Sequence, residues 1–210
     1  MRVLFLGDSI TDWFRDHDHP TDMGKGYAAF AARCLLAKHP DTVFLNLGVN
    51  GYPTGKVAEL AERGEIPEKP DLISILVGVN DFCDINQPDE WTPNFPAAGE
   101  NYRRIFRALK ARFNAEILVL QPYLAGEHHP YFSREHLLLV HAALAAAMRE
   151  ENVTHFVPLD SIINAHFSGA RAEIFSKDGV HPLPAGAEFL GEVVADAMEK
   201  VMVHMQEQGK

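Results

Sequence analysis

Short runs of β-favouring apolar residues alternate along this chain with longer segments that have the period of a helix. The expected strands are residues 3–6, 42–46, 72–77, 116–121 and 155–159. Apolar residues recur every three or four positions over residues 27–35, 97–113 and 137–148, and a last helix is expected to begin near Pro184. We expect these stripes, including Leu138 in the third, to face the core. The alternation predicts an α/β protein with three layers, α/β/α, around a mostly five-stranded parallel sheet.

One domain spanning residues 1–210 is expected, because 210 residues with 47% hydrophobic content can bury one substantial core. The 19 Lys and Arg residues against 29 Asp and Glu residues give a net charge of −10. This charge argues against nucleic acid or an anionic membrane surface as a partner. The two cysteines, Cys34 and Cys83, are too few for a disulfide framework and are expected to be reduced packing residues.

Apolar runs in this sequence are short. None approaches the roughly 18 residues that a membrane span requires. The N-terminal run reaches Asp8 at once, so it lacks the apolar length of a signal sequence. We therefore expect a cytoplasmic protein without a membrane span, and the sequence leaves homo-oligomer formation open.

Polar motifs follow the expected strands at the points where the strands end. Ser9 follows the first strand, residues 48–51 the second and residues 78–81 the third, while Asp178 and His181 come after the fifth strand and a helical stretch. In an open parallel sheet the functional crevice lies beyond the carboxyl ends of the strands. The sequence therefore predicts that these segments meet at one site.

Three of these residues have the chemistry of a nucleophile, a base and an orienting group. The Ser9 hydroxyl needs a base, and a neutral imidazole such as that of His181 suits the task near neutral pH. Asp178 lies three residues from His181, close enough to fix its tautomer and to stabilise the imidazolium. The same residues have simpler interpretations: Ser9 as a helix cap, Asp178 as an Asx turn and His181 as a surface histidine.

Four short blocks carry a resemblance to a known family. They are Gly-Asp-Ser-Ile at residues 7–10, Asn-Leu-Gly-Val-Asn-Gly at 46–51, Gly-Val-Asn-Asp at 78–81 and Asp-Gly-Val-His-Pro at 178–182. In these blocks, and in their order over nearly the whole chain, the sequence resembles the SGNH hydrolases, also called the GDSL esterase and lipase superfamily. Ile10 stands where the name-giving motif has leucine, a volume-conserving change of an unreactive side chain.

The resemblance implies a flavodoxin-like fold, a function and a set of roles. Ser9 would be the catalytic nucleophile, with Asp178 and His181 completing the triad. The oxyanion hole would comprise Ser9, the backbone N–H of Gly51 and the side-chain amide of Asn80. Gly51 as a turn glycine and Asn80 as an amide that stabilises a loop remain the simpler interpretations.

The implied activity is hydrolysis of carboxylic esters through an acyl-serine, without a cofactor. The partner would be a small-molecule ester with a short acyl chain. Arg15, Gly24 and residues 26–27 add a likeness to intracellular acetylesterases that act on carbohydrates. A lysophospholipase or a thioesterase of the same family is the alternative.

Aromatic residues are the candidates for substrate contacts. Phe82 and Trp91 follow the third strand, and Tyr123 follows the fourth. Their rings could stack on a sugar or line an acyl pocket, and they could equally anchor the loops to the core.

Two other classes of function remain open. A metal-dependent phosphoesterase could use Asp8, Asp12 and Asp81 together with His181, but the familiar ligand spacings are missing and no metal is expected. A sugar-binding module without catalytic activity could have the same fold.

Overall fold

The computed structural model describes residues 1–66, 69–82, 95–126 and 132–209. Five strands form one sheet in the order β2-β1-β3-β4-β5, and every neighbouring pair is parallel. They are β1 (Arg2–Gly7), β2 (Val43–Asn46), β3 (Leu72–Leu76), β4 (Glu116–Leu120) and β5 (His155–Val157). All five predicted strands are confirmed. The edge strand β5 ends two residues early, because Pro158 has no N–H to continue the ladder.

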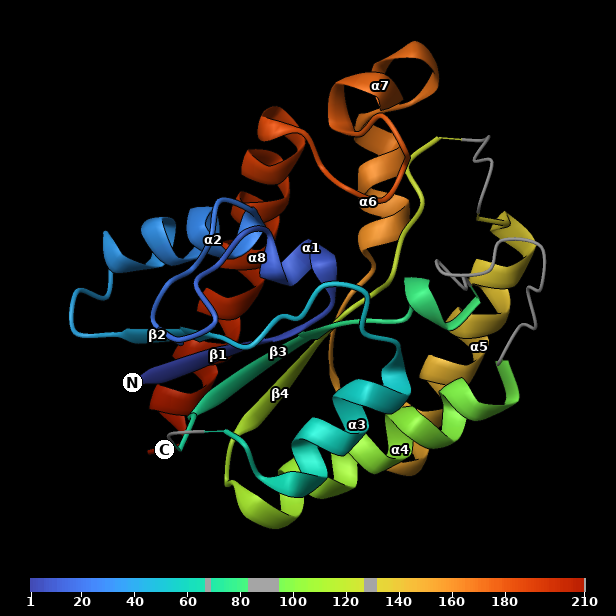
Figure 1. The fold of residues 1–210 in the computed structure, drawn as a ribbon. Coiled ribbons are helices and arrows are strands. Elements are labelled where there is room, and N and C mark those ends of the chain that lie inside the picture. The colour runs from blue at the N-terminus through green and yellow to red at the C-terminus, as the bar shows by residue number, and fades with distance from the viewer. Residues whose placement is uncertain (67–68, 83–94, 127–131, 210) are drawn as a thin grey trace.

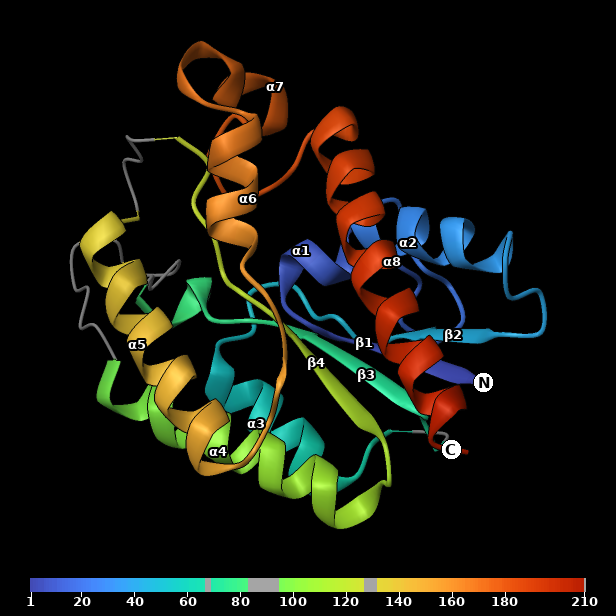
Figure 2. The ribbon, with the colours of Figure 1, turned by 180° about the vertical axis from the view of Figure 1, so that it is seen from behind.

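Helices cover both faces of the sheet (Figures 1 and 2). On one face, α2 (Tyr27–Leu36) packs against α8 (Pro184–Glu207). On the other, α4 (Phe95–Arg112) lies between α3 (Thr54–Arg63) and α5 (Arg134–Glu150) and contacts both. The predicted three-layer α/β/α architecture is confirmed.

Short helices gather around the carboxyl ends of the strands. They are α1 (Ser9–Asp12), η1 (Val79–Phe82), α6 (Leu159–His166), η2 (Gly169–Arg171) and α7 (Ala172–Phe175). Four of them have only three or four residues, about one turn, which is too short to show an apolar period, whereas the eight-residue α6 lies in the helical stretch expected after the fifth strand. They occupy the edge of the sheet where the polar motifs were expected.

The helical stripes face the core with one exception. On α5 the inward residues Leu137, Val140 and Leu144 are buried, whereas the Leu138 side chain is 55% exposed. The prediction for Leu138 was wrong, because one residue turns a helix by about 100° and carries it off the buried face. Within the described helices, no segment has both the length and the apolar character needed to cross a bilayer.

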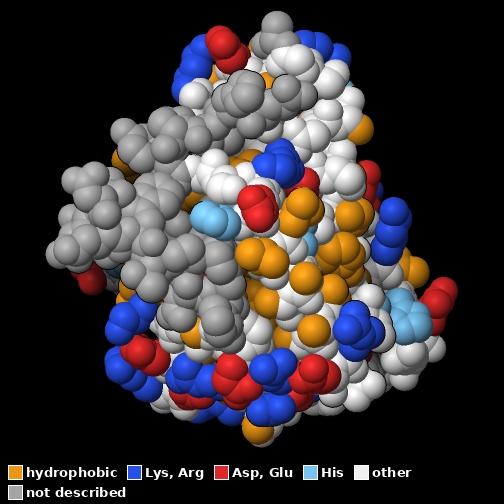
Figure 3. Space-filling model, turned by 90° about the vertical axis from the view of Figure 1, so that its right-hand side faces the viewer, with side chains coloured by type: hydrophobic (Ala, Val, Ile, Leu, Met, Phe, Trp, Pro, Cys, Tyr) orange, Lys and Arg blue, Asp and Glu red, His pale blue; other side chains and the backbone are white. Residues whose placement is uncertain are grey.

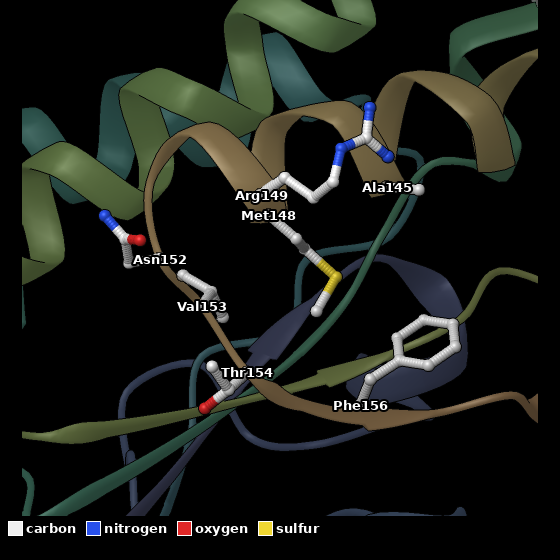
Figure 4. Close-up of a pocket in the computed structure, with 7 residues that line it drawn as sticks. All are labelled: Ala145, Met148, Arg149, Asn152, Val153, Thr154 and Phe156. Carbon is white, nitrogen blue, oxygen red and sulfur yellow. The ribbon is translucent and has the colours of Figure 1, made fainter.

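One side of the molecule carries a hollow lined by residues outside the polar motifs. Figure 3 shows hydrophobic side chains gathered in the middle of this side, above a row of charged ones. The hollow is formed by the end of α5 and by β5 (Figure 4). It is lined by Ala145, Met148, Arg149, Asn152, Val153, Thr154 and Phe156.

Candidate active site

Residues from the two ends of the chain meet at the carboxyl edge of the sheet. Ser9 begins α1 directly after β1, and His181 lies in the segment that leads from α7 into α8. The Ser9 Oγ is 2.9 Å from the His181 Nε2, and the His181 Nδ1 is 2.6 Å from the Asp178 Oδ2. A carboxylate at Nδ1 selects the tautomer with its proton there, which leaves Nε2 free to accept the serine proton.

Asp178 is held by four hydrogen bonds. Its Oδ1 accepts from the backbone N–H groups of Val180 (2.9 Å) and His181 (2.8 Å) and from the Ser176 hydroxyl (2.9 Å). Partial burial raises the pKa of Asp178, but the hydrogen bonds from His181 and Val180 outweigh it and hold that pKa well below its usual value. The Asx turn and the contact with the imidazole are therefore both present, because each uses a different carboxylate oxygen.

His181 has two neighbours that fix its ring. The hydrogen bond with Asp178 raises the pKa of His181 above its ordinary value of 6.5, although partial burial opposes this shift. On its face the imidazole stacks with the Trp13 ring, with centroids 5.6 Å apart and planes 29° apart. The imidazole therefore has an orientation set both by charge and by aromatic packing.

Asp8, not Ser9, caps α1. The Asp8 Oδ1 accepts a hydrogen bond from the backbone N–H of Ile10 at 3.0 Å. This geometry contradicts the simpler interpretation of Ser9 as the helix cap and leaves the Ser9 hydroxyl directed at His181.

Asp8 itself is a buried carboxyl group beside the nucleophile. It is 1% exposed, and its Oδ2 has no hydrogen-bond partner among the described atoms. Burial raises the pKa of Asp8 to about 7, against the effects of the Ile10 N–H and of His181. Between about pH 4 and pH 7, Asp8 therefore keeps its proton in the folded protein, whereas the unfolded chain would lose it.

Two of the three expected oxyanion donors, Gly51 and Asn80, lie on neighbouring segments. Asn80, in η1, donates from Nδ2 to the Tyr52 carbonyl at 3.2 Å, next to Gly51. Asn80 thus stabilises this loop, and its amide has a second hydrogen that this bond does not use. Gly51 has a φ of +77°, and a Cβ there would meet no atom within 4 Å. The backbone conformation favours glycine at this position, and the space in front of it is open.

Asp81 ties these two segments together. Its carboxylate accepts from the Thr54 backbone N–H at 3.0 Å and from the Thr54 hydroxyl. Asn101 on α4 donates to the same hydroxyl at 3.1 Å. Burial raises the pKa of Asp81 to about 6, although the bonds from Thr54 oppose that shift. Sequence reasoning gave Thr54 and Asn101 no part in the site, because their role depends on contacts between distant segments.

The candidate metal ligands are engaged in separate contacts. The Asp12 Oδ2 accepts from the Asn50 backbone N–H at 2.9 Å and lies 3.0 Å from the His17 Nε2. Asp8 caps α1, and Asp81 binds Thr54. In the described ranges, no three or more His, Cys, Asp or Glu side chains are grouped as metal ligands.

Tyr123 lies in the core and does not line the pocket, contrary to the prediction. It is fully buried, and its hydroxyl donates to the Val180 carbonyl at 3.0 Å while its ring meets Phe175 edge-on. The prediction of a substrate contact for Tyr123 is corrected, because a fully buried ring cannot reach a ligand. Tyr123 instead supports the segment that carries His181. Trp91 and the side chain of Phe82 lie outside the described residues.

A pocket opens beside Ser9 and His181, between α1 with the residues that follow it and the segment after β2. It has a volume of about 560 Å³. It is lined by Ser9, Asp12, Trp13, Phe14, Arg15, His17, Val49, Asn50 and His181. Sequence reasoning missed Trp13 and Phe14 as site residues, although two bulky aromatic residues directly after the serine motif were a usable signal.

Comparison with known proteins identifies the family of this chain. A model of the GDSL-like lipase/acylhydrolase family matches residues 5–189. The chain is a carboxylic ester hydrolase. It belongs to the GDSL-like lipase/acylhydrolase family.

Individual relatives cover nearly all of the chain. An acetylxylan esterase from Geobacillus stearothermophilus is 25% identical over 194 residues, which are 88% of each protein. A solved structure from Parabacteroides merdae, described as that of a GDSL-like lipase, has a TM-score of 0.80 and 27% identity over 93% of this chain and 94% of its own. A structure of the Geobacillus stearothermophilus acetylxylan esterase has a TM-score of 0.79 at 24% identity, over 95% of this chain and 92% of its own.

Activity is expected to rise with pH through one limb whose midpoint lies above 6.5. The reason is that a base must be neutral, and the Asp178 contact raises the pKa of His181 above 6.5. The measurement is kcat/KM for p-nitrophenyl acetate from pH 5 to 9. In Asp178→Asn the remaining activity should have its midpoint at a lower pH, and a midpoint that does not move would contradict the assignment.

Asp8→Asn is expected to stabilise the protein increasingly as pH rises. The folded state keeps the Asp8 proton to about pH 7, whereas the unfolded chain loses it near pH 3.8, so the wild type loses stability between these values. Asparagine keeps the Oδ1 acceptor and does not titrate. The free energy of unfolding of the variant relative to wild type should increase by about 1–4 kcal/mol between pH 4 and pH 8.

Urea titrations at the two pH values measure this difference. Asp18→Asn, which changes an exposed carboxylate, is the matched control and should show no such increase. A difference for Asp8→Asn that is the same at both pH values would contradict a protonated Asp8 in the folded state.

Proposed function

We propose that this protein is a serine esterase that removes short acyl groups, in particular acetyl groups from carbohydrates, through an acyl-serine intermediate. The observation that carries the proposal is a chain of two hydrogen bonds. The Ser9 Oγ lies 2.9 Å from the His181 Nε2, and the His181 Nδ1 lies 2.6 Å from the Asp178 Oδ2. A serine, an imidazole and a carboxylate in this order form a nucleophile, its base and the group that orients the base.

The first half-reaction transfers the acyl group to the enzyme. His181 Nε2 takes the Ser9 proton as Oγ attacks the ester carbonyl, and the imidazolium that forms is stabilised by Asp178. The tetrahedral intermediate collapses when His181 gives this proton to the leaving alcohol oxygen. The ester C–O bond breaks, the alcohol departs and Ser9 remains acylated.

Water completes the cycle. His181 takes a proton from a water molecule, whose oxygen attacks the acyl-serine carbonyl. Collapse of the second tetrahedral intermediate returns the proton to Ser9 and releases the carboxylic acid. The raised pKa of His181 suits both steps, since the imidazole must accept a proton and give it back in each half-reaction.

Oxyanion binding is proposed for three donors: the backbone N–H of Ser9, the backbone N–H of Gly51 and the Asn80 amide. Ser9 is the first residue of α1, where backbone N–H groups have no partner within the helix. The Asp81–Thr54 contact keeps the Asn80 and Gly51 segments together, so these donors are in place before substrate binds.

The acetylated carbohydrate is proposed from two supports. The Geobacillus stearothermophilus relative, 25% identical over 88% of the chain, is named an acetylxylan esterase. The pocket beside Ser9 also has mostly polar or aromatic lining residues, such as His17, Asn50 and Trp13. Hydroxyl groups of a sugar can bond to the polar groups, while a long acyl chain would find little aliphatic surface.

Ser9→Ala tests the chemistry. We expect the variant to lose about 10³-fold or more in kcat for p-nitrophenyl acetate, because the nucleophile is gone. Ser161→Ala, which removes an exposed hydroxyl on α6, is the control and should keep wild-type activity. Equal rates for wild type and Ser9→Ala would reject the proposed mechanism.

A substrate panel tests the carbohydrate part separately. Wild type is compared on acetylated xylo-oligosaccharides, ethyl acetate, p-nitrophenyl esters of increasing chain length, a lysophospholipid and an acyl thioester. The highest kcat/KM is expected for the acetylated saccharide. Preference for the lysophospholipid or for the thioester would replace this substrate class while leaving the serine mechanism in place.

Asn80→Ala is expected to lower kcat by about 10²–10³-fold with a small change in KM, because an oxyanion donor acts mainly in the transition state. Steady-state kinetics on p-nitrophenyl acetate measure the effect. Asn114→Ala, at an exposed position between α4 and β4, is the control. A loss below about threefold would remove Asn80 from the oxyanion site.

A further inference from the structure

Two consecutive bulky residues at the end of α1 have left-handed backbone conformations. Trp13 has a φ of +35° and Phe14 a φ of +63°. L-residues with large side chains rarely adopt this region, and such strain persists only where the surroundings enforce it. Burial does not explain the choice of Phe14, since its side chain is 79% exposed. A strained, exposed aromatic residue at the mouth of a catalytic pocket calls for a functional explanation.

Contacts with nearby segments of the same chain hold Trp13 and Phe14 in this left-handed conformation. Arg15 is buried, and its Nε donates to the Gly48 carbonyl at 2.8 Å while its backbone N–H donates to the Asp12 carbonyl at 3.0 Å. Lys25 donates its N–H to the Trp13 carbonyl at 3.0 Å. Gly24 passes so close that a Cβ there would lie 2.7 Å from the Trp13 carbonyl oxygen. These contacts fix residues 13 and 14 in place before any ligand binds.

In this conformation the Trp13 ring lies next to His181, and the Phe14 ring lies next to Trp13. The Trp13 ring stacks on the imidazole of His181, and the Phe14 ring meets Trp13 edge-on, with centroids 6.0 Å apart and planes 70° apart. Both residues line the pocket that contains Ser9 and His181. Phe14 is therefore an exposed aromatic residue in the lining of the pocket that contains the nucleophile and its base.

Polar groups lie beside this ring on the same pocket wall. His17 is about half exposed, with its Nε2 3.0 Å from the Asp12 Oδ2. Asn50 is exposed, and its backbone N–H is held by the same Asp12 oxygen at 2.9 Å. Asp12 thus holds two polar residues that line the pocket with Phe14. A flat apolar surface beside an amide and an imidazole matches a pyranose ring, which has an apolar face and an edge of hydroxyl groups.

We propose that Phe14, supported by Trp13, is the platform that binds the sugar ring of the ester's alcohol part, with His17 and Asn50 bonding its hydroxyls. This inference rests on the proposed carbohydrate esterase function and deepens it. On this proposal Phe14 determines specificity for the alcohol part of the ester. The positive φ of Phe14 is then explained by the placement of its ring in the pocket.

The test compares selectivity with stability in variants of Phe14. We define selectivity as kcat/KM for an acetylated xylo-oligosaccharide divided by kcat/KM for ethyl acetate, which has no ring to stack. Phe14→Gly and Phe14→Ala should lower this ratio about tenfold, mainly through KM for the saccharide. Phe14→Tyr and Phe14→Trp, which keep a flat ring, should stay within about threefold of wild type.

Thermal unfolding separates this role from a structural one. Phe14→Gly should raise Tm, because glycine adopts a positive φ without strain, so stability and selectivity should change in opposite directions. Asn152→Gly is the matched control, because Asn152 has a φ of +53° and lies in the hollow at β5, and it should leave the ratio unchanged.

Each outcome decides between the claims. If wild type hydrolyses both esters but Phe14→Gly and Phe14→Ala keep the wild-type ratio, the platform is rejected and the proposed function stands. If the selectivity ratio falls only in those Phe14 variants whose Tm also falls, the loss reflects a structural role, and the platform is rejected as well. If wild type hydrolyses ethyl acetate but no acetylated saccharide, the carbohydrate function fails first, and the platform fails with it.

Discussion

The hydrogen bond between Ser9 and His181 joins residues 172 positions apart, and the rest of the structure is arranged so that it can form. The parallel sheet brings the carboxyl ends of all five strands to one edge, where Ser9 follows the inner strand β1. The segment before α8, a helix that packs on α2, brings His181 to the same edge. The geometry of the site is thus a direct consequence of parallel topology.

The segment that carries His181 is fixed at several points. Ala125 donates to the Gly179 carbonyl at 2.8 Å and Tyr123 to the Val180 carbonyl at 3.0 Å, which ties this segment to the chain that leaves β4. An isolated bridge between Ser176 and Pro182 closes the segment at its base. Asp178 then orients the imidazole within an already restrained loop. Burial raises the pKa of the neighbouring Asp8 to about 7, so this carboxyl adds most of its negative charge only above that pH.

The sequence was sufficient to predict the strands and to single out the serine, histidine and aspartate that the structure brings together. Periodicity revealed the sheet and the helices α2, α4, α5 and α8 but not α3, and position after a strand indicated where the polar motifs would meet. The sequence did not reveal the left-handed conformation of Trp13 and Phe14, because that conformation depends on the contact of Arg15 with Gly48, 33 positions away. Tyr123 was misplaced for a similar reason: an aromatic residue near a strand end looks the same whether it lines a crevice or supports a loop.

The most direct measurement of the central claim is labelling with a fluorophosphonate, followed by peptide mapping with mass spectrometry. Such a reagent reacts with a serine only where a base activates it. The account predicts one adduct, on Ser9, and a strongly reduced rate of labelling in His181→Ala. No adduct, an adduct on another residue, or an unchanged rate in His181→Ala would contradict it.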